Sequence, residues 1–251
     1  MKKLAYLTLL LALPILAPAQ EAKKDAAPAA PKKNTLSTYR IIVKDGHEAA
    51  LKAALAAHAQ KFHTGSWKWR VSDVLTGPDS GAYQIAEGPA SWTDFEGRGD
   101  LGAEHMKDYE TNLSPHIEKT TPTVYLTYQE ELSTTAATNW SNKVVVTHLY
   151  YKPGRGPATF AAIKTYKAAW EKLGENIVVW SAFASGEPQY VIGRRLKNGF
   201  KDFDDDSPTM RKIYDEVNGA GAYDRFQDEA ARDLSHSVGE MIEFKPELSS
   251  K

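Results

Sequence analysis

The segment YRIIVKDG at residues 39–46 has a counterpart in THLYYKPG at residues 147–154. Each segment is a run of β-branched and aromatic residues that closes on Lys-x-Gly, which is the pattern of a β-strand that ends in a turn. The two segments are offset by 108 residues. An internal repeat of this length indicates that the chain contains one structural unit twice.

The correspondence continues outward from these two strands. Each is followed by a segment with helical apolar spacing, a predicted β-hairpin and a second helical segment. At the same offset Phe62 aligns with Trp170. Closing strands are predicted at residues 124–128 and 240–244. The order of elements in each copy is therefore β-α-β-β-α-β.

This order is the split-βαβ pattern of the ferredoxin-like fold and predicts an α+β fold class. Helices cover one face of such a sheet, so its second apolar face must be buried by another element. We therefore predict two ferredoxin-like βαββαβ repeats, residues 35–133 and 143–251, joined by a linker at residues 134–142. Their antiparallel sheets are expected to pack as an intramolecular pseudo-dimeric α/β barrel, so that the protein is a monomer with an internal pseudo-dimer.

In topology, in spacing and in its repeated aromatic-x-Asp-Phe segment (WTDF at 92–95, FKDF at 200–203), the chain resembles the dimeric α/β-barrel superfamily in a tandem-fused form. The resemblance covers about residues 36–248. It implies two kinds of enzyme, namely cofactor-independent monooxygenases of aromatic substrates and haem-dependent enzymes. In haem-using members of the superfamily the iron-ligating His often comes from the second helical segment, where His105 and His116 lie here.

Residues 1–19 have the three parts of a secretory signal peptide, namely a basic start, an apolar run and a small-x-small end. The run is too short to remain in a bilayer as a spanning helix. Residues 20–34 are rich in Ala, Pro and Lys, and are expected to form a disordered tether. We therefore expect an exported protein, periplasmic or secreted, whose mature part has no integral membrane segment.

Composition excludes several kinds of function. The formal net charge is −1, so there is no basic field for nucleic acid. The chain has no Cys, which excludes thiolate catalysis and Cys-ligated metal sites. No pair of His has HExxH spacing, and His58 and His63, five residues apart, are not expected to share a helix face. The sequence accordingly predicts no catalytic residue, no cofactor and no metal site.

Arg40 and His148 occupy the same point of the first strand in the two copies. Alternation along the strand places Tyr150 on the same face as His148. If this face lines the barrel, its charge needs a partner or a ligand. The alternative is that both residues lie at the barrel rim in contact with water. The other candidates for a ligand site lined by aromatic rings are Tyr83, Tyr125, Tyr190 and Trp180.

These observations predict an exported, non-catalytic protein that binds a small apolar or aromatic ligand in the barrel. The alternative is a cofactor-independent monooxygenase-like or haem-dependent enzyme of the superfamily. This alternative depends on the fold, and one fold supports many functions. A third hypothesis is an interaction role at the cell envelope through the tether and the outer helices.

Overall fold

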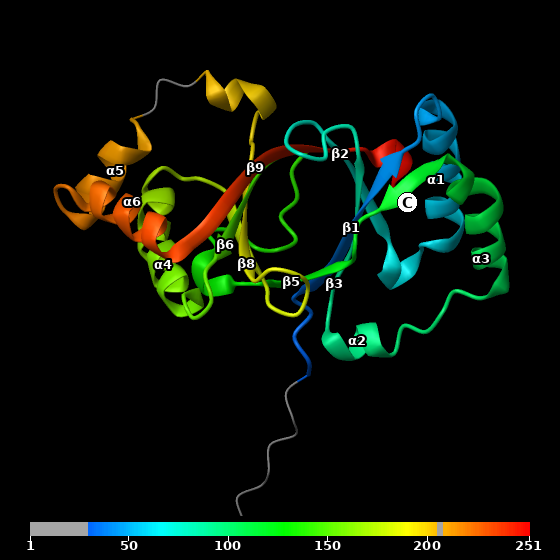
Figure 1. Cartoon of the computed structure of the whole chain (residues 1–251), viewed down its shortest axis with the longest axis horizontal. Helices are drawn as coiled ribbons and strands as arrows, with labels where there is room; N and C mark the ends of the chain where they lie inside the picture. Colours follow the sequence, from blue (N-terminus) through cyan, green and yellow to red (C-terminus); the bar gives the residue numbers. More distant parts are fainter. Residues whose placement is uncertain (1–29, 205–207) are drawn as a thin grey trace, which may run out of the picture. The chain divides into compact units, whose positions relative to one another are not determined.

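The β-branched and aromatic runs of the sequence form the strands of an antiparallel barrel in the computed structural model (Figure 1). The structure describes residues 30–204 and 208–251, and residues 31–251 belong to one compact unit. The expected signal peptide at 1–19 and the tether up to residue 29 lie outside the described residues. No helix within the described ranges combines the length and apolar character needed to cross a membrane.

The strands come from two halves of the chain, which we call the first half (residues 35–133) and the second half (residues 143–251). The first half contributes β1 (Thr35–Val43), β2 (Trp69–Val74), β3 (Tyr83–Ala90), β4 (Ile117–Thr120) and β5 (Val124–Tyr128). The second half contributes β6 (Lys143–Tyr151), β7 (Ile177–Ala182), β8 (Gln189–Arg195) and β9 (Leu234–Phe244).

Eight of these strands close a barrel in the order β1-β3-β2-β9-β6-β8-β7-β5, and β5 pairs back with β1. Strand β4 pairs with the C-terminal end of β1, beyond the residues of β1 that pair with β5. The halves are joined edge to edge, because β2 pairs with β9 and β5 pairs with β7. The predicted closed barrel is confirmed, and β4 is a strand that the sequence pattern did not indicate.

Six α-helices in the described part of the chain lie outside the barrel, in two groups (Figure 1). The first half has α1 (Glu48–Phe62), α2 (Trp92–Glu96) and α3 (Ala103–Asp108). The second half has α4 (Gly156–Lys172), α5 (Met210–Asn218) and α6 (Ala222–Asp233). Helix α2 begins in the repeated aromatic-x-Asp-Phe segment, where Ser91 and Asp94 form a capping box that satisfies the first free N–H groups.

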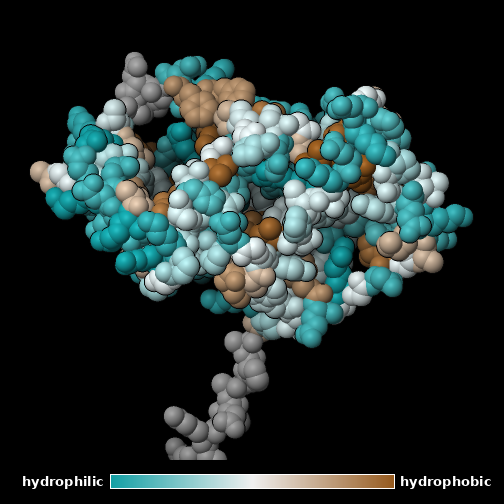
Figure 2. All heavy atoms as spheres, viewed as in Figure 1, coloured by the Kyte–Doolittle hydropathy of each residue, from teal (hydrophilic) through white to brown (hydrophobic). Residues whose placement is uncertain are grey.

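Alternation along the strands divides the apolar side chains between the barrel interior and two outer layers. The interior contains residues from strands of both halves, including Leu36, Leu126, Val146, Trp180 and Val191. The outer layer of the first half packs α1 on its strands, and that of the second half packs α4 on its own strands. The face seen in Figure 2 is mainly hydrophilic, with hydrophobic side chains in small groups.

Candidate functional site

The barrel interior brings together three of the predicted ligand residues, Arg40, His148 and Tyr150, beside a cavity of about 340 Å³. The Arg40 guanidinium donates to Asp79 at 2.8 Å and to Glu240. The His148 Nε2 atom lies 3.0 Å from the same Glu240 carboxylate. Arg40 and His148, for which the sequence left the barrel interior and the rim as alternatives, thus share one carboxylate beside this cavity.

Glu240 is the group that balances these charges, and its side chain is only 2% exposed. Burial acts to raise the pKa of Glu240, but the His148 hydrogen bond and the nearby Arg40 charge outweigh burial and leave this pKa below its usual value. The charges in the barrel are thus paired within the protein. A ligand at this position stays a prediction.

The other predicted ring residues are not gathered at one site. Trp180 lies in the barrel interior, whereas Tyr83 and Tyr190 belong to the two outer layers. Tyr125 packs against Trp92, with ring centroids 5.2 Å apart. The reason is that side chains alternate between the two faces of a strand. The residues next to Tyr83 and Tyr190 therefore point into the barrel, and Tyr83 and Tyr190 point outward.

The two candidate haem ligands lie in different His groups. Nδ1 of His116 lies 3.0 Å from Nδ1 of His47. His105 lies against His58 and His63, with ring centroids 4.8 and 5.3 Å away. Because the rings of His58, Phe62 and His63 all lie within 5.4 Å of the His105 ring, a porphyrin has no room beside it, and haem does not fit there.

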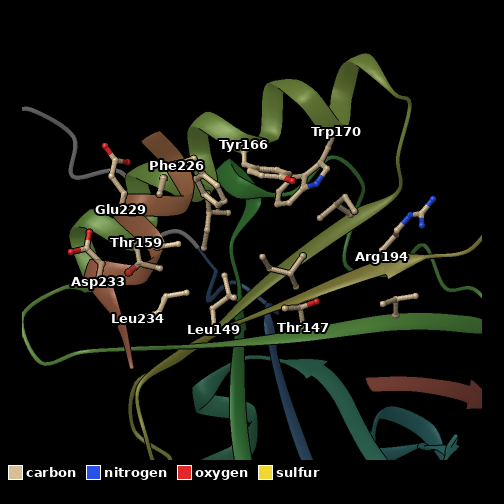
Figure 3. A pocket seen from close by; sticks show the side chains of 16 residues that line it. Thr147, Leu149, Thr159, Tyr166, Trp170, Arg194, Phe226, Glu229, Asp233 and Leu234 are labelled. Carbon is tan, nitrogen blue, oxygen red and sulfur yellow. The ribbon is translucent and has the colours of Figure 1, made fainter. Parts of the chain in front are cut away.

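A second cavity, of about 290 Å³, lies in the second half between the sheet and helices α4 and α6 (Figure 3). It is predominantly apolar, as small-molecule sites usually are. Its walls include Val145, Leu149, Ile163, Ile177, Ile192 and Phe226. We call it the second-half cavity.

Helix α4 forms the aromatic wall of this cavity through Ala162, Tyr166 and Trp170, which are spaced four residues apart and therefore lie on one helix face. The small Ala162 leaves the space that the two rings border. The Tyr166 ring also packs on Phe226, at 4.9 Å between centroids. Burial raises the pKa of Tyr166, so its hydroxyl stays protonated and remains a hydrogen-bond donor. This stripe is visible in the sequence, but its spacing alone does not distinguish a cavity wall from core.

Two of the three charged residues at the edges of the second-half cavity, Arg194 and Asp233, are paired, and the third is Glu229. Arg194 contacts Glu175 at 2.7 Å. Asp233 accepts two hydrogen bonds from Arg232, both at 2.8 Å, and this contact lowers the pKa of Asp233. The mainly apolar walls are therefore suited to a flat, largely apolar molecule.

Haem does not fit the second-half cavity either. Proteins hold haem iron through His, Cys, Met or Tyr. Among the described residues that line the cavity, only Tyr166 is of these types. A Tyr ligand binds as the phenolate, and burial of Tyr166 disfavours that form.

Neither a family profile nor a curated protein sequence matches the chain. Solved structures do match. A provisionally named monooxygenase of Fusobacterium nucleatum subsp. nucleatum ATCC 25586 has a TM-score of 0.53 and 13% sequence identity, covering 84% of this chain and 91% of that chain. An anthrone oxidase-like protein has a TM-score of 0.54 and 10% identity, covering 85% and 92%. A mutant chlorite dismutase from Candidatus Nitrospira defluvii has a TM-score of 0.51 and 8% identity, covering 85% and 92%.

At these identities the matches show the fold, and the chain has the dimeric α/β-barrel fold of the superfamily that its sequence resembles. The names of these neighbours are names of enzymes, which contradicts the prediction of a non-catalytic protein. That prediction depended on the lack of a catalytic motif. In this fold a site is built from strands and helices far apart in sequence, so a motif of fixed spacing is not required.

Proposed function

We propose that the chain is an enzyme that oxidises a small, flat aromatic substrate with dioxygen in the second-half cavity. The observation that carries this proposal is an apolar cavity whose wall presents the Tyr166 and Trp170 rings and the protonated Tyr166 hydroxyl. Aromatic walls select flat rings by stacking and edge contacts. The cavity volume of about 290 Å³ is close to the lower end of the range for small-molecule sites, roughly 300 Å³.

Tyr166 is the residue to which we assign a catalytic role. A substrate that reacts with dioxygen after losing a C–H proton passes through an enolate. A positioned hydroxyl donor stabilises the negative oxygen of such an enolate more strongly than the neutral carbonyl. Tyr166 lies in an apolar wall, where this hydrogen bond is stronger than in water.

Anthrone is a suitable probe, because it is a flat aromatic ketone with an acidic methylene group. Its oxidation by one O₂ gives anthraquinone and one water, so the substrate supplies all four electrons. The full chain is expected to consume oxygen with anthrone faster than buffer does. Ala162→Leu should abolish this activity by filling the cavity, whereas Ala161→Leu, at an exposed neighbouring position, should retain it.

Tyr166→Phe separates binding from chemistry in the same assay. It keeps the ring and removes the hydroxyl, so KM should change little while kcat falls, on the order of 10²-fold for loss of one such donor. Oxygen consumption that is the same in wild type, Ala162→Leu and Tyr166→Phe would show that this cavity is not the active site.

We also infer that the two halves are tandem copies of one ferredoxin-like unit, forming a pseudo-dimer in one exported chain. The 108-residue offset supports this, as do the matching strand orders β5-β1-β3-β2 and β9-β6-β8-β7. The signal-like residues 1–19 support export.

A further inference from the structure

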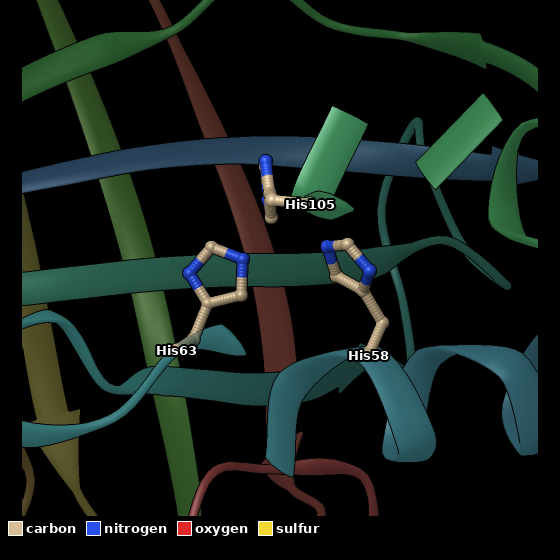
Figure 4. Close-up of side chains that lie close together, drawn as sticks. All are labelled: His58, His63 and His105. Atoms are coloured by element: carbon tan, nitrogen blue, oxygen red, sulfur yellow. The ribbon is translucent and has the colours of Figure 1, made fainter. Parts of the chain in front are cut away.

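Three histidines of the first half converge between the sheet and helices α1 and α3 (Figure 4). His58 lies within α1, His63 directly after its last residue, and His105 in α3. One ring nitrogen of each lies within 4.8 Å of those of the other two. We call this group the His triad. That His58 and His63 are not expected to share a helix face does not prevent them from meeting, because His63 has left the helix and its direction no longer follows the helical period.

The Nε2 atoms of all three histidines are buried, and none has a hydrogen-bond partner in the described part of the protein. An unsatisfied buried polar atom costs about 1–3 kcal/mol, so three of them in one place are unfavourable unless something binds there. Figure 4 shows the three rings arranged around a common space. The His triad thus has the form of a site that lacks its occupant.

Carboxylates orient two of the three rings through hydrogen bonds to their Nδ1 atoms. His58 Nδ1 donates to Asp108 at 2.7 Å, and His63 Nδ1 donates to Glu87 at 3.2 Å. A proton on Nδ1 leaves the Nε2 lone pair free to bind a cation. Carboxylate–histidine pairs of this kind fix the tautomer and raise the basicity of metal-ligating histidines.

Glu87 is itself held in place, which makes it a rigid support. Its Oε1 atom accepts hydrogen bonds from Trp69 and Arg98, both at 2.7 Å. The Trp69 ring also stacks on His63, with 3.6 Å between centroids. The position of His63 is therefore set by the carboxylate and by the stacked ring together.

We propose that His58, His63 and His105 bind one first-row transition-metal ion through their Nε2 atoms, with a fourth position for water or a small anion. Three imidazoles suit Zn²⁺, Cu²⁺, Ni²⁺ or Fe²⁺, whereas Mg²⁺ and Ca²⁺ prefer oxygen ligands. Metal–nitrogen bonds of about 2.0–2.1 Å bring ligating nitrogens closer than 4.8 Å, so small side-chain rotations complete the site. Three protein ligands with one exchangeable ligand is the arrangement of catalytic zinc sites.

Metal uptake by the full chain tests this proposal. The protein is stripped with a chelator, titrated with Co²⁺ as a coloured probe, and assayed for Zn²⁺ by competition and by elemental analysis. One ion per chain is expected. His63→Gln and His105→Gln should weaken binding more than 100-fold. His116→Gln is the matched control, because His116 pairs with His47 outside the triad, and it should bind like wild type.

Glu87→Gln and Asp108→Asn keep all three ligands and so give a second test if a ligand variant fails to fold. Each should weaken Zn²⁺ binding by about 10–100-fold, which is typical for loss of the carboxylate behind a metal-bound His. Uptake below one ion per chain, or equal uptake in the triad variants and in His116→Gln, would overturn the site and leave water as its occupant.

The exchangeable fourth position has its own readout. Azide added to the Co²⁺ protein should shift the visible bands, because it replaces a bound water. A spectrum that azide leaves unchanged would overturn the fourth position and indicate a closed structural site. None of these measurements depends on anthrone oxidation, so the metal site and the proposed activity can fail separately.

Discussion

Helices α1 and α4 present the same residue spacing to their sheets but form different layers. At the 108-residue offset, Ala54, His58 and Phe62 of α1 correspond to Ala162, Tyr166 and Trp170 of α4. In the first half the middle position supplies a member of the His triad, and the layer around it is packed. In the second half the middle position is a phenol beside a cavity of about 290 Å³.

The difference teaches that one scaffold can place different side chains at matched positions and so form different surroundings there. A helix stripe fixes where a side chain meets the sheet, and the residue type then decides whether nitrogen ligands converge or an apolar space remains.

Truncation at matched positions should reveal the difference between the packed and the hollow layer most strongly. Leu55 of α1 is fully buried, whereas Ile163, at the corresponding position of α4, borders the second-half cavity. Leu55→Ala should cost about 4–5 kcal/mol, near the top of the usual range, because it loses contacts on all sides. Ile163→Ala should cost about 2 kcal/mol, since one side of Ile163 already faces the cavity. Urea unfolding measures both, and equal losses would contradict a hollow second layer.

Replacing a small residue by a larger one at matched positions should also distinguish the two layers, with a smaller change in the free energy of unfolding. Ala54 packs against the core of the first half, so Ala54→Leu should destabilise by about 1–3 kcal/mol through overpacking. Ala162→Leu extends into the cavity and should leave the free energy of unfolding within about 0.5 kcal/mol of wild type. Thermal and urea unfolding of the two variants provide the comparison. A loss at Ala162 as large as at Ala54 would mean that the cavity is closed in solution.

The barrel and its strands could be predicted from the sequence because strand and turn signals are local. The Lys-x-Gly strand ends lie on the structure as expected, and the strand at residues 124–128 is placed correctly. The two-residue period placed Arg40 and His148 at the same point of corresponding strands, but it left open whether that face lines the barrel or lies at its rim. The pairing with Glu240 did not follow, because it depends on how β9 is registered against β6 and against β2.

Neither proposed site could be predicted from spacing alone. The His triad joins a helix residue, a residue just beyond that helix and a residue of α3 more than 40 positions later, so no motif of fixed spacing describes it. The second-half cavity is a space left between elements, and a sequence shows side chains but not the gaps between them. The stripe through Tyr166 and Trp170 was the one available signal, and a packed core gives the same pattern.

The ion pair between Arg40 of the first half and Glu240 of the second half offers a last, smaller test of whether the halves act as one unit. The pKa of Glu240 is below its usual value in the folded protein, so the charged form contributes stability above the usual Glu pKa. That contribution is lost as the pH falls through the lowered pKa. The unfolding free energy of wild type should therefore decline more steeply on the acid side than that of Glu240→Gln.

Urea unfolding between pH 7 and about pH 3 measures this slope, which reports the difference in bound protons between the unfolded and folded states. Glu110→Gln, at an exposed position of the first half, is the matched control and should keep the wild-type slope. The effect is smaller than the packing effects because burial of Glu240 opposes the gain from Arg40 and His148. Equal acid slopes in wild type and Glu240→Gln would mean that the pair does not couple the halves, and the comparison of α1 with α4 would then concern two independently stabilised layers.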